Sequence, residues 1–163
     1  MKIGTIVMYN GQLCKVTEVS ERSFFSGQSA TLYYTLTPVD RENDSFYITA
    51  KQAAEKCRPL LSEGEIEIMR VHTQGKSIPW IEERHERSRR FMEILQEGNP
   101  EQLILLIRCL VEQKARLASI KKKLTSTDEK ILCAAEKRID EEFSYVLKLS
   151  HEELISYFTQ SKE

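Results

Sequence analysis

The apolar residues of this 163-residue chain change their spacing once, and that change divides the sequence into two parts. In the first part they alternate with polar residues, as in "TLYYTLTPV", which is the pattern of a half-buried strand. From Ser62 onward they recur at the three- and four-residue spacing of helices. We therefore predict an α+β protein with a β domain over residues 1–60 and an all-α helical domain over residues 61–163.

The clearest turn signal in the first part is the dipeptide Asn10-Gly11, which lies between the strand-like segments "GTIVMY" and "QLCKVTEV". Asn-Gly supplies the two positive φ angles of a type I′ hairpin turn, so these segments should pair. "TLYYTLTPV" and "SFYITA" follow as further strands. Four or five short antiparallel strands joined by tight turns predict a small barrel of Tudor or SH3 type, an architecture that is more often a binding module than a catalyst.

The second part contains well-marked helix boundaries. Gly98 should end one helix, Asn99 should cap the next, and Pro100 suits its first turn, which predicts a helix over about residues 100–118. Ser126 and Glu129 have the spacing of a capping box for a second long helix, and Ser150 with Glu153 should cap a shorter terminal helix. The apolar spacing predicts a helical core around Leu106, Leu110, Leu132 and Ile139.

The segment "KSIPWIEERHERSRRF" holds the single tryptophan, Trp80, followed by a group of arginines. If the segment is a helix, Trp80, Arg84 and Arg87 lie on the same face as Phe91. This face is apolar around Phe91 and becomes cationic toward the N-terminal end of the helix. A projecting helix start of this kind suits nucleic acid, because guanidinium groups meet phosphates and the indole can stack on a base. Two alternatives remain open: Trp80 covers the bundle end or fills a seam between domains, and the arginines form a solvated face paired with neighbouring glutamates.

Charge is unevenly distributed. Residues 84–123 contain ten Lys or Arg against five Glu, whereas the whole chain has a formal net charge of −1. Any DNA affinity should therefore be local, weak and independent of base sequence, with a protein partner holding the chain at DNA. The residues predicted to contact DNA are Trp80, Arg84, Arg87, Arg89, Arg90, Lys121 and Lys122.

No enzymatic chemistry is indicated by the sequence. The four cysteines and three histidines are scattered without metal-ligand spacing, and the cysteines, in apolar settings, should be buried free thiols. No glycine-rich phosphate loop or nucleophile motif occurs, so we expect no cofactor, no metal and no small-molecule substrate. Without a long apolar run or a signal-like N-terminus, the chain should have no membrane partner and should stay in the cytoplasm.

The order of these parts resembles the CarD-like bacterial transcription regulators. The resemblance rests on "GTIVMYNGQLCKVTEV", on Trp followed by Arg, on "EILQEGNPEQLILLIRCL" and on "LTSTDEKILCAAEKRIDEEF". It implies an N-terminal domain similar to the RNA-polymerase-interacting domain of the transcription-repair coupling factor, binding the RNA polymerase β subunit. It also implies a helical domain that contacts promoter DNA at the upstream edge of the transcription bubble, where Trp80 would wedge into the minor groove.

Partner binding by the β domain is further suggested by polar and aromatic groups on its short strands, whose edges could pair with another sheet. The predicted partner-binding residues are Arg22, Tyr33 and Tyr47. The alternative function is a protein-interaction adaptor of the same fold that makes no DNA contact.

Overall fold

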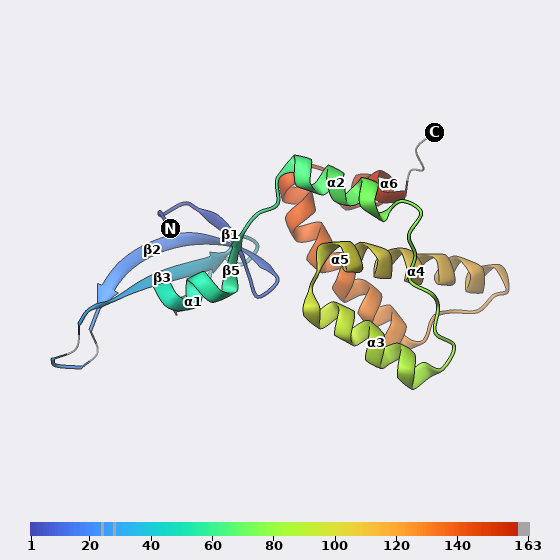
Figure 1. Ribbon diagram of the computed structural model, residues 1–163, viewed down its shortest axis with the longest axis horizontal. Coiled ribbons are helices and arrows are strands. Elements are labelled where there is room, and N and C mark those ends of the chain that lie inside the picture. The colour runs from blue at the N-terminus through green and yellow to red at the C-terminus, as the bar shows by residue number, and fades with distance from the viewer. Residues whose placement is uncertain (24, 28, 160–163) are drawn as a thin grey trace. The chain divides into compact units, whose positions relative to one another are not determined.

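The computed structural model describes residues 1–23, 25–27 and 29–159, and it divides into two compact units, Met1–Leu60 and Leu61–Glu163 (Figure 1). The first unit contains the strands, and the second is helical. The chain is therefore of the α+β class. Among the described residues, no helix combines the length and the apolar character needed to cross a membrane.

The N-terminal unit is built on an antiparallel five-stranded sheet with the strand order β4-β3-β2-β1-β5. The strands are β1 (Ile6–Tyr9), β2 (Gln12–Arg22), β3 (Thr31–Pro38), β4 (Phe46–Thr49) and β5 (Cys57–Pro59). Its order is that of an open sheet with β4 and β5 at the two edges. Two of the strands therefore offer one side each for pairing with another chain.

The predicted hairpin is confirmed. Asn10 and Gly11 both have positive φ, 50° and 73°, and Tyr9 pairs with Gln12 across the turn. Two short elements were not predicted: the residues after β4 form a helix, α1 (Ala50–Lys56), rather than an extension of the strand, and Cys57–Pro59 form the edge strand β5. Thr49 caps it, in a capping box with Gln52, and Ala53 packs into the core of the sheet.

The helical unit contains α2 (Glu63–Thr73), α3 (Arg84–Glu97), α4 (Pro100–Ser119), α5 (Ser126–Leu147) and α6 (His151–Thr159). Gly98 ends α3 with a φ of 68°, and the Asn99 side chain accepts a hydrogen bond from the Gln102 backbone, as the sequence predicts. Ser150 caps α6, also as predicted. The start of α5 differs by one residue, because Thr125 rather than Ser126 is the cap and accepts from the Asp128 backbone.

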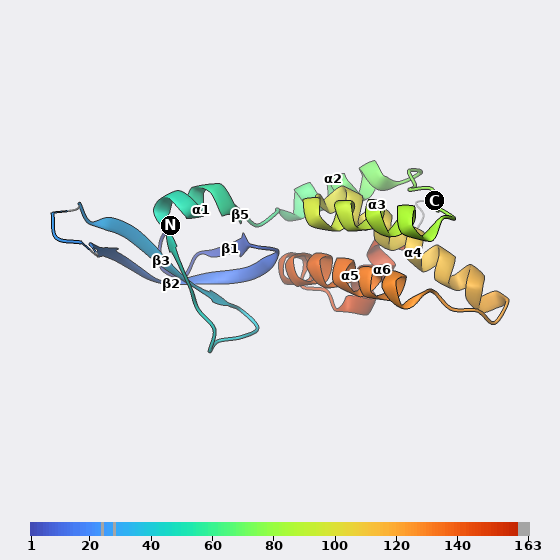
Figure 2. The same ribbon diagram turned by 90° about the horizontal axis from the view of Figure 1, so that it is seen from below.

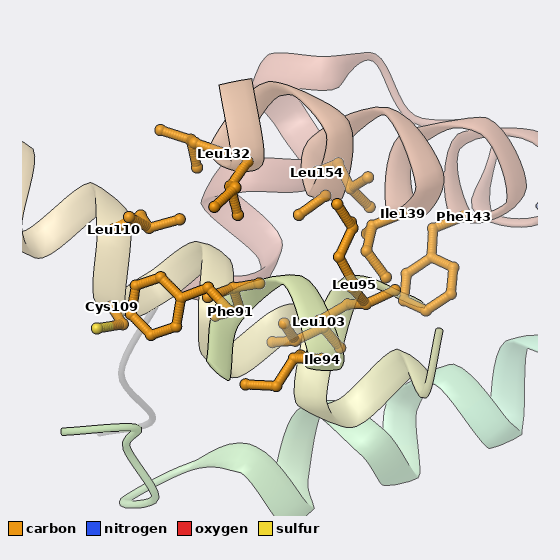
Figure 3. Close-up of a cluster of buried hydrophobic side chains, with 14 of the residues drawn as sticks. Phe91, Ile94, Leu95, Leu103, Cys109, Leu110, Leu132, Ile139, Phe143 and Leu154 are labelled. Carbon is orange, nitrogen blue, oxygen red and sulfur yellow. The ribbon is translucent and has the colours of Figure 1, made fainter. Parts of the chain in front are cut away.

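The helical core confirms the predicted residues, since Leu106, Leu110, Leu132 and Ile139 are all buried. Figure 3 shows how α3 contributes to this cluster: Phe91, Ile94 and Leu95 point toward the leucines of α4 and the apolar face of α5. In Figure 2, α3 and α5 lie side by side. Burial of this extent accounts for the folding of the unit, because each fully buried large apolar side chain contributes about 1.5 to 3 kcal/mol.

The cysteines differ in part from the prediction of four buried thiols. Cys14 and Cys109 are buried, but Cys57 is half-buried and Cys133 is exposed on α5. Burial raises the pKa of the thiols of Cys57 and Cys109. All four are free.

Candidate nucleic-acid interface

The predicted helix start around Trp80 is wrong in its local structure. Residues 76–82 are not helical, and α3 begins at Arg84, four residues after Trp80. Glu83 takes the cap position, where its carboxylate accepts a hydrogen bond from the Glu86 backbone. Contact with that backbone N–H lowers the pKa of Glu83. Glu is not among the residues usually found at caps, which explains why the pattern alone placed the helix start too early.

Arg87, predicted to contact DNA, is instead buried with 5% of its surface exposed. Its Nε and Nη2 atoms donate to the two carboxylate oxygens of Asp128 at 3.1 and 2.9 Å. Its Nη1 atom donates to the backbone oxygens of Ile81 at 3.0 Å and Glu82 at 3.2 Å. Four hydrogen bonds thus hold the buried guanidinium inside the unit, so Arg87 is not available to a phosphate as the sequence predicted.

Trp80 is half-buried rather than projecting. The Arg87 guanidinium carbon lies 4.4 Å from the centre of the indole, a cation–π contact, and the Phe91 ring meets the indole edge-on at 6.1 Å. Trp80 thus packs against the core of its own helical unit. The sequence alternative in which it covers the bundle end is closer to this arrangement than the projecting helix start.

Three of the predicted cations remain available. Arg84 is exposed on the first turn of α3, and Lys121 and Lys122 are exposed in the turn between α4 and α5. None of the three forms an ion pair with any residue that the structure describes. The turn leads directly into α5, whose Asp128 holds Arg87 of α3, so these groups lie at the same end of the unit (Figure 1).

Arg89 and Arg90 are less available for phosphate. Both are exposed, but both pair with the carboxylate of Glu93, at 3.1 and 3.4 Å. Exposed pairs of this kind are worth at most about 1 kcal/mol, so phosphate could displace Glu93 at small cost. The solvated-face alternative is therefore right that these two arginines are exposed and paired with a glutamate, but the partner is Glu93 rather than the expected Glu82, Glu83 or Glu86.

In the N-terminal unit the strand register brings the three predicted partner-binding residues to one face of the sheet. Tyr33 of β3 pairs with Ser20 of β2, and Ser20 is two positions before Arg22 on the same strand. Tyr47 of β4 pairs with Thr35 of β3, and Thr35 is two positions after Tyr33. Residues two apart on a strand share a face. Tyr47 is 67% exposed on the edge strand β4, and Arg22 is exposed and forms a long 4.0 Å pair with Glu18.

The opposite face of the same sheet carries the core, with Tyr34, Leu36 and Ile48 buried. Arg22, Tyr33 and Tyr47 are therefore on the side away from the core, where a partner could reach them.

No protein-family model matches the chain, and none of the curated proteins compared with it matches either. The functional assignment therefore depends on the residues and on their geometry.

The sequence did not reveal Asp128 as the partner of Arg87. Its position three residues after Thr125 is typical of a cap, and no local spacing connects it with a residue 41 positions earlier. One feature of the sequence did point to burial: Arg87 shares a helix face with residues of the core. A charged residue in such a position is usually paired with an opposite charge.

Proposed function

We propose that this protein is a CarD-like, non-enzymatic transcription regulator of the bacterial cytoplasm. In this proposal the N-terminal unit is a Tudor-like module that binds the RNA polymerase β subunit. The helical unit contacts promoter DNA near the upstream edge of the bubble, weakly and without base specificity. Neither a cofactor nor a small-molecule substrate takes part.

The observation that carries the DNA contact is the way in which Trp80 is held. Asp128 fixes the Arg87 guanidinium through two parallel hydrogen bonds, and the guanidinium in turn lies against the indole. An aromatic ring fixed in this way loses little conformational freedom on binding, which favours stacking on an unpaired base. Arg87 therefore positions Trp80 and does not itself meet DNA.

The charges around Trp80 fit the same role. Arg84, Lys121 and Lys122 are exposed cations at the end of the unit where Trp80 lies. Each can neutralise one phosphate and release counterions, while Arg89 and Arg90 would add weaker contacts. Glu82 and Glu86, exposed beside Arg84, keep the affinity low, which agrees with a protein delivered to DNA by polymerase.

Polymerase binding is supported by the face that carries Arg22, Tyr33 and Tyr47 and by the neighbouring edge strand β4. Aromatic and arginine side chains are enriched at protein interfaces, and an edge strand can add to a partner's sheet. The N-terminal unit can therefore contact a partner both through these side chains and through backbone hydrogen bonds of β4.

The adaptor without DNA contact is the second candidate, and one observation favours it. Trp80 packs against Phe91 and the helical core, so its burial has a structural explanation that needs no DNA. In an adaptor the exposed lysines would be solubilising charges and the β unit would be the only binding surface.

The two candidates are separated by measuring open-complex lifetime and polymerase capture with the full chain and bacterial RNA polymerase. The double variant Lys121→Glu/Lys122→Glu should retain capture but lose most of the effect on lifetime, and the logarithmic salt dependence of DNA binding should fall by about two phosphate contacts. The matched control is Lys137→Glu, an exposed position further along α5, which should behave as the wild type.

Capture itself is tested by Tyr47→Ala and Arg22→Ala, which should weaken retention of the β subunit without altering the helical unit. If the lysine variant leaves lifetime unchanged while Tyr47→Ala abolishes capture, the adaptor is the correct function. If neither set changes capture or lifetime, the assignment to transcription is wrong.

A further inference from the structure

The helical unit contains a pocket of about 550 Å³ that is lined by none of the residues predicted to contact DNA. It is formed by the turn after α2, by the middle of α4 and α5, and by α6. Most of its wall is apolar, with Ile104 and Ile107 from α4, Ile139 from α5, and Leu154 and Phe158 from α6. This size and this mainly apolar lining are typical of pockets that bind small molecules, which measure about 300 to 1,000 Å³.

Two hydrogen-bonding groups stand at one end of the pocket, Arg108 and Gln74. Arg108 Nη1 donates to the backbone oxygens of Thr73 at 2.6 Å and Lys76 at 3.3 Å, and its Nη2 atom reaches the oxygen of Phe158 at 3.5 Å. The Gln74 side-chain nitrogen is buried and has no hydrogen-bond partner within the described part of the chain. A buried donor without a partner is unfavourable, so an acceptor oxygen supplied by a ligand would be favoured there.

The other end of the pocket is acidic. Glu136 and Asp140 lie one turn apart on α5, and His151 Nδ1 at the start of α6 contacts the Asp140 carboxylate. Burial raises the pKa of both carboxyl groups, against the opposing effect of His151. Partly desolvated carboxylates of this kind gain from a cationic or hydrogen-bond-donating group placed beside them.

The helix α6 sets the distance between the two ends. Its first residue, His151, contacts the acidic end, and the backbone oxygen of Phe158 accepts from Arg108 at the other. They are seven positions apart along the helix, which corresponds to about 10 Å. The apolar side chains of Leu154 and Ile155 lie between, so this wall of the pocket is apolar with polar groups of opposite kind at its two ends. Glu112, one turn after Arg108 on α4, is a further acidic lining residue.

We propose that this pocket binds a small bipolar molecule, with an apolar body about 10 Å long, an acceptor oxygen at Arg108 and Gln74, and a cationic or donating group at Glu136 and Asp140. A simple fatty acid could bind only to Arg108 and Gln74, and an alkyl amine only to Glu136 and Asp140. The site is separate from the proposed DNA contact, since none of the residues predicted to contact DNA lines it.

The test is isothermal titration calorimetry of the full chain with three matched probes, 8-aminooctanoate, octanoate and octylamine. We expect saturable binding of one molecule per chain, with 8-aminooctanoate at least several-fold tighter than either probe that lacks one end group. Shortening the probe to 6-aminohexanoate should weaken binding about fourfold for each methylene removed, because each buried methylene contributes a constant increment. Equal affinity for all three probes, or no saturable binding, would overturn the proposal.

Two variants locate the binding. Ile155→Trp places a bulky ring on an exposed lining residue and should abolish binding, whereas Ile120→Trp changes an exposed isoleucine outside the pocket and should have no effect. Gln74→Leu should selectively weaken the two probes that carry a carboxylate. Binding that survives Ile155→Trp in a protein with normal thermal unfolding would place the probe elsewhere and refute the site.

Discussion

Two polar regions of the helical unit differ in one respect, whether their hydrogen-bonding groups are satisfied. At the start of α3, the Arg87 guanidinium donates four hydrogen bonds, to the Asp128 carboxylate and to two backbone oxygens, and its face lies against Trp80. Beside α6, Gln74 lines the pocket, and its buried side-chain nitrogen has no hydrogen-bond partner among the residues that the structure describes. Charged residues are prominent in the first region, yet the second has the properties of a binding pocket. The partners of a polar group, rather than its presence in the sequence, therefore distinguish a structural role from a binding role.

The largest effect is expected at the satisfied region. Arg87→Met should lower the free energy of unfolding by about 3 to 5 kcal/mol, because it leaves the Asp128 carboxylate buried without its counter-ion. Chemical denaturation followed by circular dichroism measures this change. Emission from the single tryptophan should also shift to longer wavelength, since the indole loses the guanidinium that covers it.

The matched control is the double variant Arg87→Met/Asp128→Leu, which removes both charges and should recover a large part of the lost stability. If the double variant is as unstable as Arg87→Met alone, the packing of the two side chains matters more than their charge pairing. The start of α3 and the pocket would then not differ in the way described above.

The second prediction compares two positions on α4. Leu110→Ala should cost about 2 to 5 kcal/mol because Leu110 is fully buried in the core. Ile107→Ala should cost about 1 kcal/mol, since the half-buried Ile107 borders a pocket that already exists and its removal creates little new cavity. Equal losses in urea denaturation would mean that the pocket wall is packed as tightly as the core.

Trp80→Ala should give an intermediate loss, about 1 to 3 kcal/mol, which is less than for a fully buried aromatic residue because the indole is half-exposed. Trp80→Phe keeps a ring against Arg87 and should retain most of the stability. Thermal unfolding of both variants provides the comparison. A loss below about 0.5 kcal/mol for Trp80→Ala would restore the projecting tryptophan predicted from sequence.

The smallest effect concerns the acidic end of the pocket. Burial raises the pKa of Glu136 above its ordinary value of 4.5, so the folded protein holds this proton more tightly than the unfolded chain. The wild type therefore loses stability as pH rises from 4.5 through that raised pKa. Glu136→Gln should be more stable than the wild type at pH 7, by less than about 0.5 kcal/mol given the partial exposure, and the difference should vanish near pH 4. A variant that is less stable at pH 7 would indicate that the carboxylate has a favourable partner.

The sequence predicted those features that depend on a few neighbouring residues. Asn10-Gly11 specified its turn, and Gly98, Asn99 and Pro100 specified the junction between α3 and α4, because the required backbone angles and cap bonds are local. The predictions failed where a distant residue decides the outcome. Nothing near Arg87 in sequence indicates that it meets Asp128.

The pocket was missed for a related reason. Ile104 and Ile107 continue the apolar stripe of α4, and a stripe indicates burial without specifying whether a neighbouring helix fills the space. Arg108 beside them resembled an ordinary surface cation. Its bonds to Thr73, Lys76 and Phe158 involve three backbone oxygens far away in the chain, which no local pattern encodes.

The buried acids of α5 have a consequence for the rates at which the unit opens. Asp128 near the start of the helix holds Arg87, and Glu142, fourteen residues or about 21 Å further on, accepts a hydrogen bond from the Leu61 backbone at 3.0 Å. Unwinding either end of α5 would break one of these tertiary bonds as well as its own helical turns. Amide protons in the middle of α5 should therefore exchange with solvent deuterium only when the whole helical unit unfolds, whereas those of α6, which is short and borders open space, should exchange through local opening.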